Sequence, residues 1–347
     1  MEDVEYSRIK AKNYKCFGKQ ECGFDTILPI NLIIGRNNSG KSSMLDMIQY
    51  ATNPYNISDL GHKGNSPEIL ITTILTESNL KGSFSPAASD GDIPGNHWVF
   101  GRKWIEKPIT FRLNENRKRF FVSIDPQWDS PKAEEIFNRV LSSVSSPIET
   151  KSFKRLVSDR DIRSEELSKP LSLLPNGEGA TTIISNYLTK FNLPTSLVKN
   201  TLLEELNKIF QPDVTFTDIS VQQINGNWEV YLSEINKGSI PLSQSGSGIK
   251  TVLLVLIFLY MIPEIENKPL RDYYFGFEEL ENNLHPALIR RLFLYLREIA
   301  LEKECAFFLT THSNVVIDLF GKDEISQILH SWIQVVSATF ESSPKNT

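Results

Sequence analysis

The sequence reads Gly35-Arg36-Asn37-Asn38-Ser39-Gly40-Lys41-Ser42 between an apolar run, residues 27–34, and a segment that favours helix, residues 42–50. This is the complete Gly-x-x-x-x-Gly-Lys-Ser/Thr pattern of a phosphate-binding loop. Glycines let backbone N–H groups wrap around phosphates, and the start of the following helix adds a partial positive charge. A glycine-rich turn with an exposed lysine is the alternative, but strand, loop and helix in this order favour the phosphate-binding interpretation.

The pattern predicts a bound Mg-ATP. Lys41 is expected to reach the β- and γ-phosphates, and the Ser42 hydroxyl is expected to bind Mg²⁺. The predicted nucleotide contacts in this loop are Gly35, Arg36, Asn37, Asn38, Ser39, Gly40, Lys41, Ser42 and Ser43.

A second motif is Tyr-Tyr-Phe-Gly-Phe-Glu-Glu-Leu-Glu at residues 273–281. Apolar residues followed by paired carboxylates are typical of a Walker B strand. Glu278 is then expected to hold the magnesium through water, and Glu279 to polarise the attacking water. Glu278 is one methylene longer than the aspartate usual at that position. The alternative is an acidic helix start, since carboxylates favour helix N-termini.

Two further motifs follow the same order along the chain. Residues 242–248, Leu-Ser-Gln-Ser-Gly-Ser-Gly, precede an apolar helix and predict another anion-binding helix start, although a flexible linker has the same composition. Residues 307–313, Phe-Phe-Leu-Thr-Thr-His-Ser, predict a strand that ends in His312. Open α/β sheets bind ligands at this edge, so we expect a functional histidine there instead of a structural one.

Bulk properties favour a soluble intracellular chain. The 347 residues carry a formal net charge of −5, with 40% hydrophobic and 23% charged residues. The three cysteines show no metal-ligand spacing, which predicts a reduced, cytoplasmic protein without a disulfide. The charged N-terminus predicts no secretory signal. The apolar run 251–262 is expected to be a buried helix, too short to span a bilayer, that stops at Pro263.

We predict one α/β domain over residues 1–347, with a mixed central sheet. Residues 1–130 form a lobe with the phosphate loop and an antiparallel β subdomain, 131–210 a helical insertion, and 211–330 the lobe with the other motifs. Alternation over 98–124 predicts antiparallel strands, and 61–95 predicts loops or an edge hairpin. Residues 216–235 predict strands around a turn at Asn225–Asn227. The sequence contains no heptad run, so we expect no long coiled-coil arm.

The ordered motifs GRNNSGKSS, LSQSGSGIK, FEELENNLHP and FFLTTHS resemble the ATPase domain of the OLD and RecF-like branch of ABC ATPases. The opening IKAKNYKCFG is similar to the first strand of SMC-like heads, so the resemblance spans residues 8–320. The pieces SDRDI, from residue 158, and LPNGEGAT, from residue 174, look like a stretch of AAA-family, OLD-type anti-phage defence ATPases. The resemblance implies an ABC-type P-loop ATPase head.

The resemblance also implies roles. Ser243, Ser245, Gly246 and Gly248 would be the signature motif that completes the ATP site of a second protomer. Glu279 would be the catalytic glutamate, His312 the switch histidine that senses the γ-phosphate, and residues 282–285 the D-loop at the dimer seam. The signature reads SQSGSG instead of LSGGQ, and Leu280 replaces a common proline. No glutamine is assigned to the Q-loop.

OLD-family nucleases carry a TOPRIM domain after the ATPase. Residues 313–347 lack the spaced Glu and Asp-x-Asp cluster of such a metal site, so no nuclease activity is expected in this chain. Basic residues gather at 112–119 and 151–163, where they could contact nucleic-acid phosphates or form a solvated charged face.

The leading hypothesis is an ATP-dependent dimer, or a higher oligomer, that acts as a switch or clamp with nucleic acid. Its setting would be anti-phage defence with an effector that is a nuclease, a toxin or a reverse-transcriptase system. A RecF-like DNA-repair ATPase is the alternative enzyme, and a nucleotide-gated, non-catalytic scaffold for a toxin is the alternative from another class. A transporter ATPase would need a membrane partner, against which the ENNLHP segment argues.

Overall fold

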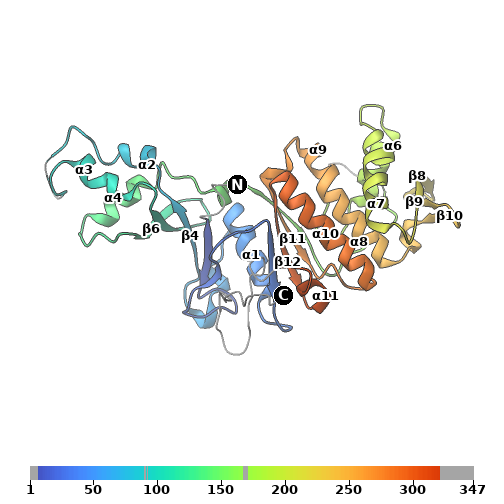
Figure 1. The fold of residues 1–347 in the computed structure, drawn as a ribbon, viewed down its shortest axis with the longest axis horizontal. Coiled ribbons are helices and arrows are strands. Elements are labelled where there is room, and N and C mark those ends of the chain that lie inside the picture. The colour runs from blue at the N-terminus through green and yellow to red at the C-terminus, as the bar shows by residue number, and fades with distance from the viewer. Residues whose placement is uncertain (1–6, 90, 92, 167–170, 321–347) are drawn as a thin grey trace, which may run out of the picture. The chain divides into compact units, whose positions relative to one another are not determined.

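The computed structural model describes residues 7–89, 91, 93–166 and 171–320. The chain forms two compact units (Figure 1). Of the described residues, unit 1 contains those within 7–28 and 34–153, and unit 2 contains those within 29–33 and 154–320. The main division therefore falls at residue 153, between the predicted boundaries at 130 and 210. The prediction that residues 313–347 contain no nuclease metal site falls mostly on residues 321–347, which lie outside the described part of the chain.

Unit 1 is built on a five-stranded antiparallel sheet in the order β2-β1-β4-β5-β6. Its strands are β1 (Arg8–Lys12), β2 (Cys22–Phe24), β4 (Glu68–Ile74), β5 (Pro108–Leu113) and β6 (Arg119–Ile124). Its helices are α1 (Lys41–Thr52), η1 (Ser58–Leu60), η2 (His62–Gly64), α2 (Glu77–Lys81), α3 (His97–Gly101), η3 (Arg102–Trp104), α4 (Ala133–Val140) and α5 (Pro147–Thr150). The antiparallel β subdomain predicted from the sequence is therefore present.

Two local predictions in unit 1 are wrong. The segment 61–95 contains the central strand β4, which pairs with β1 and β5 and buries Ile69, Leu70 and Ile71. Residues 98–104, expected to be a strand, form α3 and η3 instead. Asn96 accounts for this helix start, because its side chain accepts hydrogen bonds from the N–H groups of Trp98 and Val99.

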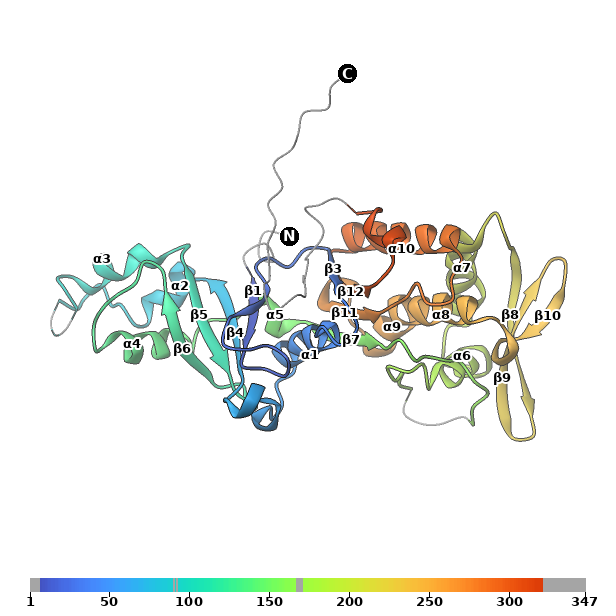
Figure 2. The ribbon, with the colours of Figure 1, turned by 90° about the horizontal axis from the view of Figure 1, so that it is seen from below.

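Unit 2 contains a four-stranded sheet in the order β3-β12-β11-β7 (Figure 2). Its strands are β3 (Ile30–Ile34), β7 (Ser152–Leu156), β11 (Tyr273–Glu278) and β12 (Ala306–Thr311). The strands β11 and β12 run parallel, with Tyr274 opposite Ala306 and Glu278 opposite Thr310. Their carboxyl ends therefore lie at one edge of the sheet. The predicted α/β fold class, with strands followed by a glycine loop and helices, is confirmed.

The remaining elements of unit 2 are a small sheet and a set of helices. The sheet has the order β10-β9-β8, with β8 (Phe216–Ile224), β9 (Asn227–Glu234) and β10 (Gly238–Pro241). The helices are α6 (Ala180–Thr189), η4 (Leu197–Leu202), α7 (Leu203–Phe210), η5 (Leu242–Gln244), α8 (Ser247–Leu256), η6 (Ile257–Met261), α9 (Ile262–Glu266), η7 (Leu270–Asp272), α10 (Pro286–Lys303) and α11 (Asn314–Ile317). The turn between β8 and β9 confirms the predicted hairpin.

The prediction of a helical insertion over 131–210 needs correction. β7 lies inside this segment and belongs to the four-stranded sheet of unit 2, whereas α4 and α5 before it belong to unit 1. The short, mostly polar sequence Ser-Phe-Lys-Arg-Leu carries little strand signal of its own. Its conformation depends on the neighbouring strand, which the local sequence does not reveal.

The long apolar helix is longer than the sequence predicts. Helical residues continue through α8, η6 and α9 past Pro263 to Glu266, because Pro263 lies in the first turn of α9, where its missing N–H costs little. By length and composition alone, residues 247–266 could cross a membrane. Residues Val252 to Ile257 are nonetheless fully buried in unit 2, as expected of a core helix.

Aromatic rings stabilise the central sheet of unit 2. Phe275 on β11 is fully buried and stacks on Tyr273 and Phe307, with ring centroids 5.7 and 5.2 Å apart. Phe277 lies 5.7 Å from Phe275 and 5.8 Å from Phe307. These contacts fix the two parallel strands that carry the predicted carboxylates and histidine.

We expect Phe275→Ala to lower the free energy of unfolding by about 3–5 kcal/mol, because it removes a fully buried ring from a packed core. Chemical denaturation measures this loss. Phe191→Ala is the matched control, since this ring is fully exposed and its removal is expected to leave stability unchanged. Equal stability of the two variants would contradict the described core.

Candidate functional site

The phosphate loop lies in unit 1 and begins helix α1. Gly40 precedes Lys41 with φ 97°, and Asn38 has φ 61°. A Cβ atom at Gly40 would lie 2.4 Å from the Cys16 sulfur and 3.0 Å from the Phe17 ring. Glycine is therefore required at this position both for the backbone conformation and for space. The first turn of α1 contains no acidic residue, so its N–H groups are available to an anion.

Two side chains of the loop fit a phosphate ligand. Lys41 is only 8% exposed, and its ammonium lies 3.2 and 3.3 Å from the carbonyl oxygens of Gly35 and Arg36. The buried Ser39 hydroxyl has no hydrogen-bond partner in the described part of the chain. A buried hydroxyl is costly without a partner, and a phosphate oxygen would supply one. Ser42, predicted to bind magnesium, is exposed at the start of α1, and Ser43 lies beside Cys16.

The paired carboxylates lie in unit 2 where β11 ends. Glu278 is the last residue of the strand, and Glu279 turns the chain with φ 45°, which is unfavourable for a residue with a side chain. The Glu279 amide donates to the carbonyl and hydroxyl oxygens of Thr310 at 3.0 and 3.2 Å. Backbone strain of this kind is retained where surrounding contacts hold it in place.

The side chain of Glu279 meets two predicted functional residues. One carboxylate oxygen accepts a hydrogen bond from the Asn282 amide at 3.0 Å, and the other lies 3.4 Å from Nε2 of His312. The structure therefore brings together the predicted base, the predicted switch histidine and the first residue of the predicted D-loop. Both Glu279 and His312 remain partly accessible to solvent, as a group that acts on a substrate must be.

Glu281 is a site residue that sequence reasoning missed. Its carboxylate accepts hydrogen bonds from the Thr311 hydroxyl at 2.7 Å and from the His312 amide at 2.9 Å. It therefore holds the turn after β12 against the turn after β11 and positions His312 relative to Glu279. The third carboxylate of Glu-Glu-Leu-Glu was the available signal for this role.

Glu278 has a partner that the sequence did not predict. Arg155 on β7 lies 2.7 and 2.5 Å from one carboxylate oxygen through Nε and Nη2. A metal bound directly to that oxygen would have to displace the guanidinium, so the predicted contact through water fits better. Among the described residues, no group of three His, Cys, Asp or Glu side chains could hold a metal alone.

The predicted signature residues begin helix α8, also in unit 2. The Ser243 amide donates to buried Glu229 at 3.0 Å, and Lys250 donates to the Ser243 carbonyl at 2.8 Å. Gly246 is exposed, with open space where a Cβ atom would lie, whereas a Cβ atom at Gly248 would lie 3.0 Å from Leu284. The side chains of Glu229 and Lys250 therefore hold the backbone of Ser243, whereas Gly246 is exposed to solvent.

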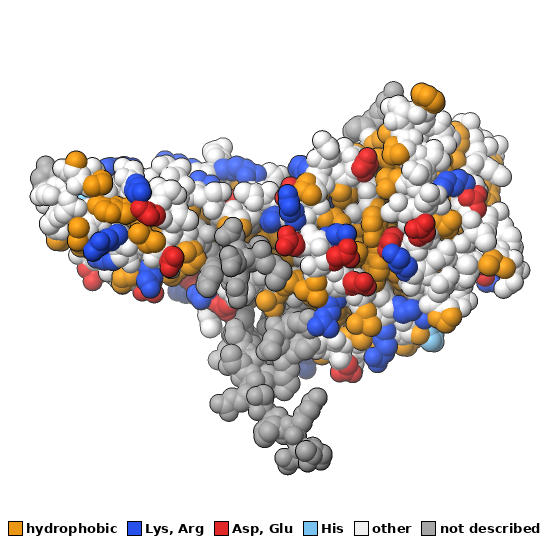
Figure 3. All heavy atoms as spheres, turned by 45° about the horizontal axis from the view of Figure 1, so that its top comes forward, with side chains coloured by type: hydrophobic (Ala, Val, Ile, Leu, Met, Phe, Trp, Pro, Cys, Tyr) orange, Lys and Arg blue, Asp and Glu red, His pale blue; other side chains and the backbone are white. Residues whose placement is uncertain are grey.

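Most of the basic residues proposed to contact nucleic acid have other partners. In segment 112–119, Arg117 donates to the Thr52 carbonyl, and Arg119 pairs with Glu149. In segment 151–163, Lys154 forms an ion pair with Glu266, and Arg155 forms the ion pair with Glu278 described above. On the face shown in Figure 3, Lys and Arg side chains are interspersed with Asp and Glu. These segments therefore provide weak support for a phosphate-binding surface.

Comparison with known families identifies the chain. The model of a family described as AAA ATPase domain matches residues 126–317, and a model described as AAA domain matches residues 8–213. The chain belongs to the AAA ATPase domain family. The two matches together contain the phosphate loop, the carboxylate turn and His312. No curated protein matches the sequence of this AAA ATPase domain.

Solved structures offer distant likenesses. An SMC head bound to the C-winged helix domain of ScpA is 16% identical with a TM-score of 0.47, and 90% of each chain is covered. The SMC head domain from Thermotoga maritima is 13% identical with a TM-score of 0.45 over 95% of each chain. An Smc head domain with a coiled coil and joint from Pyrococcus yayanosii is 12% identical, with a TM-score of 0.47 over 95% of each chain. These values are too low to assign a role to any residue.

Lys41→Ala is expected to weaken the binding of Mg-ATP strongly, because it removes the charge that would meet the β- and γ-phosphates. Calorimetric titration of the AAA ATPase domain with Mg-ATP measures this. Lys19→Ala, which changes an exposed lysine of the same unit, is the control and should bind like the native protein. Unchanged affinity in a folded Lys41→Ala protein would refute the loop assignment.

Proposed function

We propose that this AAA ATPase domain binds Mg-ATP on the loop 35–43 and hydrolyses it with Glu279 as the general base. The observation that carries this proposal is the cluster at the ends of β11 and β12. There Glu279 lies within hydrogen-bond reach of Asn282 and 3.4 Å from His312. A carboxylate held by two neighbours at the carboxyl edge of parallel strands is suited to accept a proton from water.

The residues have distinct tasks in this mechanism. Lys41 and the N–H groups at the start of α1 bind the phosphates, and Ser42 and Glu278 hold Mg²⁺, the latter through water. Mg²⁺ neutralises charge on the transferred phosphoryl group. Asn282 holds one oxygen of Glu279, and the other, which lies 3.4 Å from Nε2 of His312, orients and deprotonates the attacking water. His312 senses the γ-phosphate from beside Glu279.

We further infer that the domain is of the ABC type, so that ATP joins two protomers. The signature residues Ser243, Ser245, Gly246 and Gly248 would then complete the ATP site of the partner. This role is supported by the hydrogen bonds of Glu229 and Lys250 to the Ser243 backbone and by the exposure of Gly246 to solvent. ATP would stabilise only the closed dimer, because only there would its phosphates meet the second protomer.

A nucleotide-gated scaffold is the second candidate. The Arg155–Glu278 pair favours it, because a guanidinium on the carboxylate expected to serve magnesium would slow hydrolysis without blocking nucleotide binding. A nucleic-acid partner, an effector protein, a role in anti-phage defence and a RecF-like repair role remain predictions that rest on the sequence resemblance. The occupied basic side chains of segments 112–119 and 151–163 add no support for nucleic acid.

Glu279→Gln separates the two candidates. It keeps size and hydrogen bonding but removes the proton acceptor, so ATP turnover should fall by on the order of 10²-fold or more while Mg-ATP still binds. Phosphate release and calorimetric binding measure the two effects. Glu278→Gln should weaken Mg-dependent binding as well, and Glu298→Gln, an exposed change on α10, is the control. A native rate in Glu279→Gln would rule out Glu279 as the base, and a native protein without turnover would favour the scaffold.

Gly246→Arg tests the dimer. Gly246 has ordinary backbone angles, φ −61° and ψ 148°, and open space around it, so the variant should fold and bind ATP as a monomer. Its side chain would occupy the place of the partner's nucleotide and prevent ATP-dependent dimerisation, as measured by light scattering. Gly82→Arg, also with open space and φ −69°, is the matched control. Normal dimerisation of Gly246→Arg on ATP would contradict the composite site.

A further inference from the structure

The side chain of Arg160, in unit 2, contacts the backbone of the carboxylate turn at residues 278–279. Nη1 donates to the carbonyl oxygen of Glu278 at 2.7 Å, and Nη2 donates to that of Glu279 at 3.0 Å. Nε donates to the Thr251 hydroxyl on α8 at 3.1 Å. A fourth bond, from Nη1 to the Val157 carbonyl at 2.9 Å, anchors the guanidinium to its own segment.

The guanidinium matches the strained turn geometrically. Its planar fork donates to two successive carbonyl oxygens, on either side of the residue whose φ is 45°. A lysine ammonium is a point charge on a flexible stem and cannot reproduce this fork. Burial lowers the pKa of Arg160 to about 10, against the opposing effect of Glu281, Glu279 and Glu278, so the side chain stays charged at neutral pH. These hydrogen bonds are therefore charge-assisted.

The next residue connects to the signature motif. Asp161 accepts a hydrogen bond from Lys250 at 2.7 Å, and the same ammonium donates to the Ser243 carbonyl at 2.8 Å. Burial favours a higher pKa for Asp161, but the Lys250 and Arg163 hydrogen bonds outweigh it and hold this pKa below its ordinary value. Arg160 and Asp161 thus join the start of α8 to the turn after β11 through two adjacent side chains.

The segment that carries this pair is itself braced. The Asp161 amide donates to the Asn176 carbonyl and the Val157 amide to the Pro175 carbonyl, both at 2.9 Å. Gly177 has φ 94°, and a Cβ atom there would lie 2.3 Å from the Asp161 carbonyl oxygen. This close approach explains why a glycine turn follows the Asp-Arg-Asp stretch. These two backbone hydrogen bonds hold the segment that carries Arg160 against residues 175–177.

We propose that Arg160 is a positioning residue that holds Glu279 in its working orientation and couples that orientation to the signature helix α8. The inference rests on the proposed function, since it assigns Glu279 the role of base. When the signature residues meet a partner's nucleotide, a shift of α8 reaches the turn through Thr251 and Arg160. Hydrolysis then depends on dimer closure, because the Arg160 guanidinium bonds both to Thr251 on α8 and to the carbonyl oxygens of Glu278 and Glu279.

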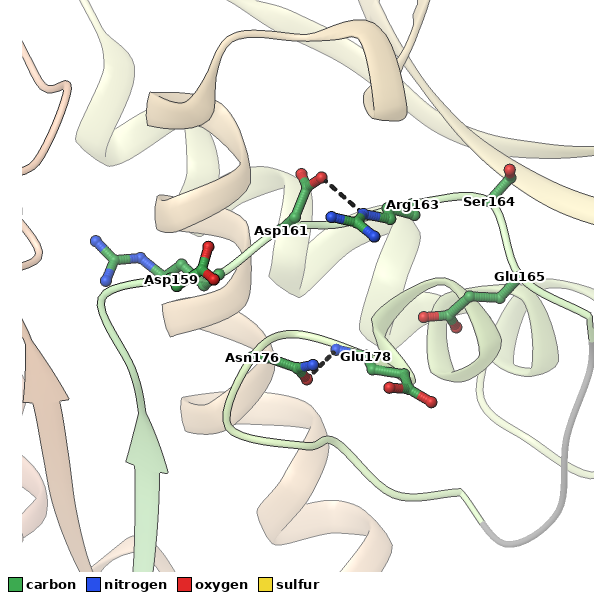
Figure 4. A pocket seen from close by; sticks show the side chains of 8 residues that line it. Asp159, Asp161, Arg163, Ser164, Glu165, Asn176 and Glu178 are labelled. Carbon is green, nitrogen blue, oxygen red and sulfur yellow. Dashed lines mark hydrogen bonds and ion pairs between the residues drawn. The ribbon is translucent and has the colours of Figure 1, made fainter.

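A cavity beside Arg160 makes a chemical test feasible. It has a volume of about 320 Å³ and is lined by Arg160, Asp161 and Glu165 among other polar residues (Figure 4). Removal of the Arg160 side chain would leave the carbonyl oxygens of Glu278 and Glu279 without their guanidinium donor, next to a residue that lines the cavity. A small guanidinium compound in solution could then enter and replace the lost donors.

The experiment is steady-state hydrolysis of Mg-ATP by Arg160→Ala and Arg160→Lys. In both, kcat is expected to fall by on the order of 10²-fold, the scale of misplacing a catalytic group by about 1 Å. KM and the calorimetric Kd for Mg-ATP should stay within about twofold of native, because the phosphate loop is intact. Methylguanidinium should restore at least a tenth of the lost kcat to Arg160→Ala.

Two controls isolate the effect. Arg163→Ala removes an exposed guanidinium that lines the same cavity and pairs with the side chain of Asp161, without a contact to the carboxylate turn among the described hydrogen bonds, and should leave kcat unchanged. Glu279→Gln should not respond to methylguanidinium, because its turn is still held. Thr251→Val removes only the contact with α8 and should lower kcat by about 3- to 10-fold, the scale of one hydrogen bond.

Two results would overturn the proposal. One is a native kcat in Arg160→Lys, and the other is a fall in kcat matched by weaker Mg-ATP binding and no response to methylguanidinium. A native protein without ATP turnover would defeat the proposed function alone. The positioning role is then decided by hydrogen exchange, in which the Glu279 and Asn282 amides of Arg160→Lys should exchange at least 10-fold faster than in the native protein. Equal exchange would overturn it.

Discussion

The parallel pairing of β11 with β12 is the constraint on which the candidate site depends. It sets Glu278 opposite Thr310, so that the two strands end at the same edge of the sheet. From there the Glu279 amide bonds to Thr310, and Glu281 bonds to the Thr311 hydroxyl and the His312 amide. A slip by one residue would turn each side chain to the other face of the sheet and separate Glu279 from His312. The stacked rings of Tyr273, Phe275 and Phe307 fix this register.

The sequence predicted the elements whose signals are local. The loop before α1 has glycines where φ is positive or space is absent, so its pattern follows directly from its geometry. Strands β11 and β12 are continuous apolar runs because both of their faces are buried, and each ends in polar residues that mark the sheet edge. The two carboxyl-edge motifs predicted functional residues at Glu279 and His312, and the family resemblance implied that both serve one ATP site.

Elements whose conformation depends on distant partners were not predictable in this way. β4 lies in a segment rich in turn residues, and β7 has only two apolar residues, so neither carries a strong strand pattern. Arg155 and Arg160 belong to a basic segment of the sequence, for which both phosphate contact and a solvated charged face were open alternatives. In the fold they meet Glu278 and the backbone of the carboxylate turn, which lie more than a hundred residues further along the chain. Only the tertiary structure reveals contacts of such sequence separation.

The contacts of Arg160 also bear on the departures of this chain from the family pattern. They are made to carbonyl oxygens, which every residue has, and not to the carboxylates of Glu278 and Glu279. The turn can therefore keep its shape when an aspartate is replaced by glutamate at 278 or a proline by leucine at 280. Buried Leu280 contributes apolar packing where a proline would contribute stiffness. In this chain the stiffness comes instead from Glu281, the last residue of the motif, and from the Arg160 guanidinium, which lies outside it.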